Sequence, residues 1–244
     1  MYTELKEKTK QSEYLACEQW WVFMCLIFVG GYFGAFTYCL RGGVFCNAQT
    51  ANMLLVGVSL GQGNISEALK YFISIASYFI GVIFAEIMPN PVRKTLGIRW
   101  DTLLIALEIA AVAALGFLPE SAPHRISQIA VNIITAMQFT TFRQAQGEVM
   151  STTFCTNHLR QTGTALVKWA KKPHPKRQRQ LFLRHISMIC VFIIGAFASY
   201  LLGSIFGGKS VWFSAVPLAA VLIYLLYADL RGERDKLDAV PKGH

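Results

Sequence analysis

FCNAQTANMLLVG, residues 45–57, places four polar side chains between two long apolar runs. The four are Asn47, Gln49, Thr50 and Asn52. An exposed turn of a soluble protein would explain them, and so would a polar site inside a membrane. The composition of the rest of the chain decides between these two explanations.

The chain has 244 residues, of which 54% are hydrophobic and only 15% are charged. Soluble domains usually carry about a quarter of charged residues, so this composition argues against a soluble protein. Several runs approach the roughly 20 apolar residues that a helix needs to cross a bilayer. We therefore expect an all-α, polytopic membrane protein. The net charge of +9 follows from the orientation of its loops and requires no nucleic acid.

Eight segments follow one another along the chain. They are Trp20–Leu40, Val44–Leu60, Ala68–Met88, Asp101–Leu118, Ile126–Phe142, Thr152–Trp169, His185–Phe206 and Val211–Tyr227. The second and the sixth are poor spanning helices, because polar groups in hydrocarbon are costly unless they are paired. Asn157, His158, Arg160 and Gln161 crowd the sixth segment. We expect both to be short re-entrant helices surrounded by protein.

The motif at Gln49 recurs in the second half of the chain. Gln161-Thr162-Gly163-Thr164 lies 112 residues after Gln49-Thr50-Ala51-Asn52. The same offset places the first four segments on the last four, which predicts an internal repeat. The chain then divides into an N-terminal segment (1–19), a first membrane repeat (20–118), a second membrane repeat (125–228) and a tail (229–244).

The distribution of Lys and Arg predicts how the repeats are oriented. The loops after the third and the sixth segments are both basic and should both be cytoplasmic. Three segments separate these loops, so one of the three does not cross the membrane. This gives six crossing helices as an inverted 3+3 repeat, with two re-entrant helices and both termini cytoplasmic. The cations left outside are Arg41, Lys70, Arg125 and Lys209. A 4+4 topology would put the two basic loops on opposite sides.

The polar residues of the two re-entrant segments are the candidate binding residues. They are Asn47, Gln49, Thr50, Asn52, Arg160, Gln161, Thr162 and Thr164. One interpretation is helix capping with tight packing, since Asn and Thr satisfy the free N–H groups of a helix N-terminus. The other is a polar cavity for a small polar or anionic solute, because helix N-termini favour anions.

Glu108 lies in the middle of the fourth segment, and an intramembrane carboxylate is a functional candidate. It would either bind a coupling proton or pair with Arg41, Arg143 or Arg160. For Arg41 and Arg143 the alternative is an interfacial position with the charge in water. His158 has no second His at ligand spacing in its segment, so no metal is expected. The sequence has no phosphate loop or nucleophile motif, and we predict no cofactor and no catalytic residue.

Two stretches carry a family resemblance: residues 30–57, GGYFGAFTYCLRGGVFCNAQTANMLLVG, and residues 152–166, TTFCTNHLRQTGTAL. They resemble the YoaK-like family of bacterial multi-pass inner-membrane proteins, and the resemblance covers nearly the whole chain. Gly34 stands where the family tends to have Asp, and Ala51 where it tends to have Gly. The resemblance implies a bacterial inner-membrane location and a multi-pass domain of unknown function, and names no substrate.

The sequence favours a transporter or channel for a small polar or anionic solute, embedded in the lipid bilayer. One alternative is a membrane enzyme acting on a lipid-linked substrate, with Glu108 or His158 as its base. Another is a non-catalytic assembly or regulatory protein of the membrane. No nucleic-acid partner is expected, and the oligomeric state is left open, a homo-oligomer included.

Overall fold

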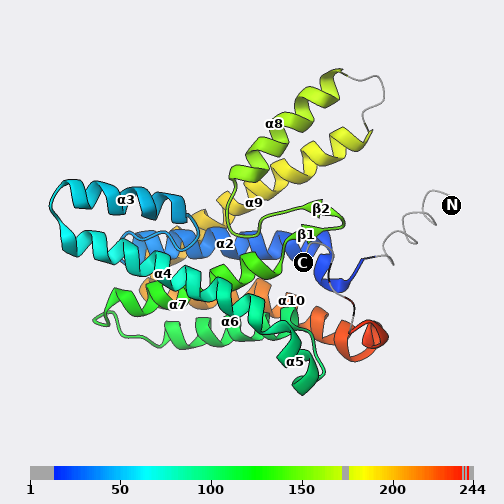
Figure 1. The fold of residues 1–244 in the computed structure, drawn as a ribbon, viewed down its shortest axis with the longest axis horizontal. Coiled ribbons are helices and arrows are strands. Elements are labelled where there is room, and N and C mark those ends of the chain that lie inside the picture. Colours follow the sequence, from blue (N-terminus) through cyan, green and yellow to red (C-terminus); the bar gives the residue numbers. More distant parts are fainter. Residues whose placement is uncertain (1–13, 172–175, 238, 240, 242–244) are drawn as a thin grey trace.

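A computed structural model describes residues 14–171, 176–237, 239 and 241 (Figure 1). Nearly all regular structure in these residues is helical, as expected. The long helices are α2 (Trp20–Leu40), α4 (Ile65–Ile87), α6 (Trp100–Gly116), α7 (His124–Thr141) and α9 (Lys176–Phe206). The shorter ones are α3 (Gln49–Gly61), α5 (Pro89–Leu96), α8 (Thr156–Lys171) and α10 (Ala215–Tyr227). Short 3-10 helices occur at 16–18, 207–214 and 234–236, and a π-helical turn occurs at 228–232.

Three helical stretches in the described part of the chain are long and apolar enough to cross a membrane. They are Trp20–Leu40, Ile65–Ile87 and the continuous stretch Lys176–Gly232, which contains α9 and α10. α6 has 17 residues, or about 26 Å at 1.5 Å per residue, close to the roughly 30 Å of a bilayer core. The expected short segments are short, with 13 residues in α3 and 16 in α8, but they are not surrounded by protein as predicted. Each helix packs on one neighbour, and only two residues of α3 and three of α8 are buried.

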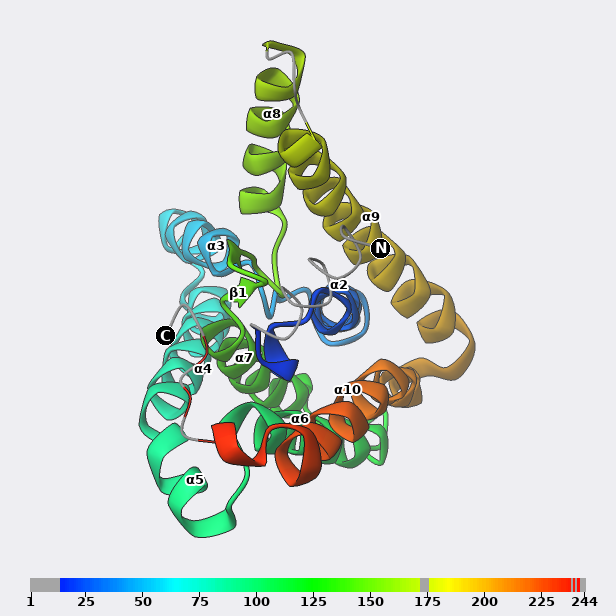
Figure 2. The same ribbon diagram turned by 90° about the vertical axis from the view of Figure 1, so that its right-hand side faces the viewer.

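The helices pack in a regular pattern around α2, which Figure 2 shows end-on near the centre of the molecule. α2 runs along α9, and α7 runs along α4. α3 packs on α4, α8 packs on α9, and α6 pairs with α10. The hydrophobic core lies where α2, α6, α7 and α10 meet. Large apolar side chains of α4 and α9 point outward, such as Phe79 and Phe197, as lipid-facing helices require.

Glycines allow two of these helix pairs to touch backbone to backbone. A Cβ at Gly31 would collide with the Phe192 carbonyl, and a Cβ at Gly195 with the Phe28 carbonyl. α4 and α7 meet in the same manner, since a Cβ at Gly81 would lie 2.5 Å from the Ile133 oxygen. Small residues at membrane helix crossings permit this approach.

Several element boundaries differ from the prediction. Residues 44–48 precede α3 as a loop, and α9 begins at Lys176 rather than at His185. The early start of α9 has a simple reason: Lys, Arg and Gln are good helix formers, so its polar first turns extend the apolar run. A two-stranded hairpin, β1 (Gln144–Ala145) and β2 (Glu148–Val149), was also missed. Its turn residues, Gln146 and Gly147, both have positive φ, as a tight hairpin turn needs.

Candidate functional site

The loop before α3 turns back into the molecule and reaches the middle of α2. Asn47 Nδ2 donates to the Gly30 carbonyl at 3.1 Å, ten residues along the 21-residue helix. Asn47 also lies against Gly34, where an added Cβ would be 2.8 Å from Nδ2. A side chain as large as Asp would displace Asn47. α3 therefore begins halfway along α2.

The loop before α8 reaches the same level of α2. A Cβ at Gly30 would collide with the Thr152 carbonyl, so this loop crosses α2 in direct contact. Gln138 Nε2 on α7 donates to the Leu26 carbonyl at 3.2 Å and to the Thr152 carbonyl at 3.4 Å. The two interruptions of the helical chain therefore both pack against Gly30.

A closed hydrogen-bond network fixes α3 to α4 and α7. Gln49 Nε2 donates to Asn132 Oδ1 at 2.9 Å, and Ser74 Oγ donates to the same oxygen at 3.0 Å. Asn52 Nδ2 donates to Gln49 Oε1 at 3.0 Å and to the Phe45 carbonyl at 2.7 Å. Buried amides that satisfy one another in this way rigidify a core.

These polar residues do not act as helix caps. The residue at the N-cap of α3 is Ala48, which makes no side-chain capping bond. Asn47 and Asn52 are buried and bond to neighbouring elements, whereas Thr50 is exposed. The capping interpretation is wrong for α3, and the packing half of that interpretation describes Asn47, Gln49 and Asn52.

The second motif lies in a different environment, on the arm formed by α8 and α9 (Figure 1). Thr162 and Thr164 donate back to carbonyls of their own helix, at His158 and Arg160. Exposed Arg160 donates to Asn157 at 2.9 Å. Gln161 and Thr164 line a polar cavity of about 250 Å³ between α8 and α9. Its charged wall residues are Lys168, Arg177 and Glu148. The arrangement could receive a small charged group.

A histidine pair at the base of this arm was not foreseen. His158 Nδ1 and His185 Nδ1 are 2.9 Å apart, and both side chains are buried. His158 Nε2 lies 2.8 Å from the Ser151 carbonyl. If His158 donates to that carbonyl, its Nδ1 accepts from His185 Nδ1. No local spacing signals this pair, because 27 residues separate the two histidines. No cluster of three metal-binding side chains occurs among the described residues.

Glu108 does not form the expected ion pair. Arg41 pairs with Glu120 at 3.4 Å, Arg143 pairs with Glu86, and Arg160 is bound to Asn157. The Glu108 carboxylate is fully buried in α6, and neither of its oxygens has a hydrogen-bond partner in the described part of the chain. All three arginines are therefore engaged elsewhere.

Further uncompensated polar atoms lie near the meeting point of the two loops. Among the buried oxygens of the described residues that have no hydrogen-bond partner, four belong to this region: Thr135 Oγ1, Gln138 Oε1, Thr152 Oγ1 and Thr153 Oγ1. They come from α7 and from the loop that crosses α2 at Gly30. Buried polar atoms in native proteins are nearly always satisfied, so this group requires a partner that the chain does not provide. The sequence analysis did not single out these residues.

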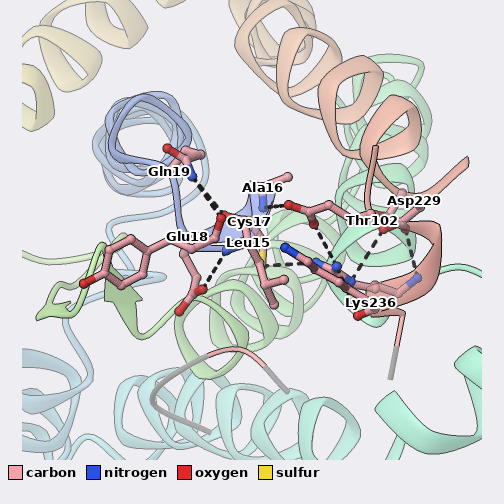
Figure 3. Close-up of polar contacts among 11 residues, drawn as sticks. Leu15, Ala16, Cys17, Glu18, Gln19, Thr102, Asp229 and Lys236 are labelled. Atoms are coloured by element: carbon pink, nitrogen blue, oxygen red, sulfur yellow. Dashed lines mark hydrogen bonds and ion pairs between the residues drawn. The ribbon is translucent and has the colours of Figure 1, made fainter. Parts of the chain in front are cut away.

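At the N-terminal end of α2 the described parts of both chain ends meet, and the segment 15–19 lies beside Thr102, Asp229 and Lys236 (Figure 3). The Arg99 amide and the Thr102 hydroxyl both donate to Asp229 Oδ2, at 3.0 and 2.7 Å. The Arg99 guanidinium donates to Glu233 at 2.8 Å, and Glu233 accepts from the Ala16 amide at 2.9 Å. The described parts of the N-terminal segment (1–19) and of the tail (229–244) are therefore hydrogen-bonded to each other at this end.

The titratable groups of this cluster change one another's pKa. Burial, and then the neighbouring Asp101 carboxylate, raises the pKa of the Cys17 thiol well above its usual range. The thiol is therefore protonated and can donate to Asp101. Burial alone would lower the pKa of Arg99, but the surrounding carboxylates, Asp101 foremost, hold it above its ordinary value. Arg99 is thus a permanent cation in this cluster.

Comparison with known proteins gives a family and no function. The model of a family described as "Protein of unknown function (DUF1275)" matches residues 22–224. The chain is also similar to the UPF0700 transmembrane protein YoaK of Bacillus subtilis (strain 168). The two are 24% identical over 206 residues, which is 82% of this chain and 89% of the relative. No solved structure matches the chain.

Proposed function

The chain belongs to the DUF1275 family and is a YoaK-like integral membrane protein, and from this premise we propose that it is a transporter or channel for a small polar or anionic solute. We place the solute site near the middle of α2, between the loops that precede α3 and α8. One observation carries the proposal. The loops before α3 and α8 both contact Gly30, beside four buried oxygens that have no partner among the described residues.

The proposed architecture has six crossing helices arranged as an inverted 3+3 repeat. Four helices of the first half have a counterpart in the second: α2 and α7, α3 and α8, α4 and α9, α6 and α10. When each of these helices is replaced by its counterpart, the main helix pairs in contact stay the same. The contact of Phe28 with Gly195 then corresponds to that of Ile133 with Gly81. Such pairwise agreement supports two copies of one fold. Inverted repeats with interrupted helices near the midplane recur in transporters.

The proposed orientation has both termini in the cytoplasm of a bacterial inner membrane. It is supported by the contacts of Ala16, Arg99 and Glu233, which bring the start of the chain, the α5–α6 connection and the tail to one end. Basic residues gather in these same regions of the sequence, and positive loops stay inside.

The two polar motifs have different roles in this proposal. The amides of Gln49 and Asn52 are hydrogen-bonded within the network, and they fix the position of the N-terminus of α3. Gln161 and Thr164 face the cavity of the α8–α9 arm. The N-termini of both short helices follow directly after the central loops, and such partial positive charges suit an anionic group. Glu108 is a candidate for a coupling proton because it has no partner among the described residues.

The competing proposal is a non-catalytic membrane assembly protein, and the closed network of Gln49, Asn52, Ser74 and Asn132 favours it. We propose no enzymatic role. The two candidate bases, Glu108 and His158, lie on α6 and α8, which pack against different helices. Both ring nitrogens of His158 are engaged.

Exchange experiments in proteoliposomes test the transport proposal. The full chain is reconstituted and assayed for counterflow of labelled amino acids, small carboxylates and phosphate. We expect at least one solute to exchange, and Gln138→Leu and Thr152→Val to abolish that exchange. Thr152→Val removes only an unpartnered hydroxyl and should leave thermal stability unchanged, whereas Gln138→Leu also loses the bonds of Nε2 to two carbonyls and should lower it. Thr50→Val, on the exposed face of α3, is the matched control and should retain the exchange. Exchange that survives both central substitutions would exclude the proposed site, and absence of exchange for all solutes would favour the assembly alternative.

A further inference from the structure

The two flanks of α8 differ in polarity. The face that packs on α9 consists of the buried residues of α8, which are His158, Thr162 and Ala165. One flank carries the exposed side chains of Leu159 and Leu166, which are seven residues apart and so lie on one side of the helix. The opposite flank carries Gln161, Thr164 and Lys168, which the same periodicity places together. One flank of α8 therefore suits lipid and the other suits water.

The polar flank of α8 forms one wall of the cavity of about 250 Å³ in the α8–α9 arm. The first turns of α9 supply Arg177 and Gln178 to the opposite wall, and Glu148 of β2 also lines the cavity. Apolar side chains contribute only Ala165 and Leu181 to the lining. The cavity is thus suited to a small polar solute rather than to an alkyl chain.

Contacts near both ends of α8 hold the two walls in place. Near the end of the helix, the rings of Trp169 and Phe182 pack with their centroids 5.8 Å apart. Near its start, His158 and His185 share the hydrogen bond between their Nδ1 atoms. Because α8 and α9 are joined at both places, the cavity is formed without a ligand, which lowers the free-energy cost of binding one.

The donor groups of the cavity wall are available to a ligand. Lys168 makes no ion pair or hydrogen bond within the described part of the chain. Arg177 lies 3.6 Å from Glu148, but its side chain is 81% exposed, so this ion pair is weak. The side-chain amides of Gln161 and Gln178 likewise have no hydrogen-bond partner among the described residues. Two cations and two amides with free N–H groups therefore line one small volume.

We propose that this cavity binds a small soluble oxyanion of the phosphate type, held by Lys168, Arg177 and the two glutamine amides. Arg binds such an oxyanion with its planar fork of N–H groups, and Lys binds it as a compact charge. The Glu148 carboxylate accepts the hydroxyl hydrogen of a hydrogen phosphate ion, so a carboxylate in the wall is compatible with this ligand. The apolar flank of α8 lies on the far side of the helix, which favours a soluble anion over the head group of a phospholipid.

The inference deepens the proposed function, and it rests on that function only in taking the bound anion as the transported solute. Binding itself does not require transport and is measured without it.

Thermal unfolding of the full chain in detergent at pH 7, with potassium phosphate as the probe, tests this site. A ligand that binds only the folded state raises the Tm with concentration. We expect phosphate to raise the Tm of the wild type above that in KCl of equal ionic strength. Phosphate also stabilises folded proteins without occupying a site, so the decisive comparison is between variants. Lys168→Gln and Arg177→Gln should each need at least tenfold more phosphate for the same shift.

The matched controls are Lys171→Gln and Arg179→Gln, which remove the same charges from exposed residues of the same two helices outside the cavity. Both should keep the shift of the wild type. Lys168 and Arg177 are exposed as well, so none of the four substitutions should lower the Tm in the absence of phosphate. An equal shift in the wild type and all four variants would overturn the proposal, and so would equal losses in the cavity and control variants.

Dioleoylphosphatidic acid added to the micelles distinguishes a lipid head group from a soluble anion. We expect the phosphate-dependent shift of the wild type to be unchanged in its presence, whereas loss of that shift would overturn the assignment to a soluble anion. A phosphate shift without solute exchange in proteoliposomes would count against the transport proposal alone. Solute exchange without a phosphate shift would overturn this site alone.

Discussion

Asn132 links the buried polar network of the opening motif to α7. Its Oδ1 accepts from Gln49 and Ser74, and its Nδ2 donates to the Gln128 carbonyl at 2.7 Å. It is fully buried in α7. Through this one amide, α3, α4 and α7 are connected.

Substitution of Asn132 should therefore destabilise the fold. Asn132→Leu leaves the donors of Gln49 and Ser74 unpaired in a buried place, which costs about 1–3 kcal/mol for each such group. Thr50→Val, next to Gln49 but on the exposed face of α3, should change stability by less than about 0.5 kcal/mol. Denaturant unfolding in detergent micelles measures both. Equal effects would show that the network does not stabilise α3.

Glu120 should give the protein a pH dependence at acidic pH. Its carboxylate accepts from the Gly208 amide at 2.6 Å and pairs with Arg41, and these contacts lower its pKa below the usual 4.5. The stability that ionised Glu120 adds to the folded state is present above pH 4.5. It is lost as the pH falls through the lowered pKa of the folded state. The Tm difference between pH 7 and pH 4 should thus be smaller in Glu120→Gln than in the wild type. Asp235→Asn, as the control, should leave that difference unchanged.

At the level of single residues, the sequence identified polarity but not partners. Asn47, Gln49 and Asn52 were recognisable because they interrupt an apolar run. Asn132, Thr135 and Gln138 stand three residues apart on one side of α7, and this stripe was a usable signal that was missed. The partners of Arg41, Arg143 and Glu108 were not predictable, since each depends on side chains more than 50 residues away or on none at all.

At the level of elements, the crossing of α2 and α9 depends on two glycines, each facing the other helix's backbone. Gly57 and Gly61 on α3 are four residues apart, but neither has an atom within 4 Å of an added Cβ. Gly31 and Gly195 are the positions in contact. Spacing alone does not distinguish a glycine at a crossing from one on an open face.

Enlarging Gly195 should separate α2 from α9. Gly195→Leu forces a side chain into the Phe28 backbone, and overpacking of this kind costs about 1–3 kcal/mol or more. Gly57→Leu places the same side chain in open space on α3 and is the matched control. The apparent melting temperature in detergent should fall only for Gly195→Leu. A similar fall for both variants would show that replacing either helical glycine by leucine lowers the melting temperature, whether or not it lies at a helix crossing.

The accuracy of the predicted helix ends depended on how sharply each apolar run stops. Hydropathy correctly located α2, α4 and α6 to within a few residues, because their apolar runs end at polar or proline-containing loops. It placed the start of α9 nine residues late, because the polar first turns of that helix extend past the apolar run. These turns are stabilised by packing against α8 and by helix propensity, neither of which hydropathy measures.

At the level of the whole molecule, the same helix pairs recur in the two halves of the chain, and we propose that the halves are inverted. The proposed topology makes a direct prediction. A reporter inserted in the α3–α4 turn at Gln62 should be active only outside the cytoplasm, and one inserted after Lys171 only inside. Alkaline phosphatase and green fluorescent protein fusions in bacterial cells measure the two sides. The same side for both positions would exclude the inverted 3+3 arrangement.

The sequence by itself determined the membrane class, the helical composition and the positions of the two chain interruptions. These are local properties: apolar length, Pro and Gly stops, and polar residues within hydrophobic runs are all visible within about 20 neighbouring residues. Only the tertiary structure decided that both interruptions meet at Gly30, that His158 faces His185, and that Glu108 and Asp101 each retain an unpaired buried oxygen. Such relations arise when helices distant in sequence pack together, and the pattern of polarity along one helix does not specify which neighbour will supply a partner.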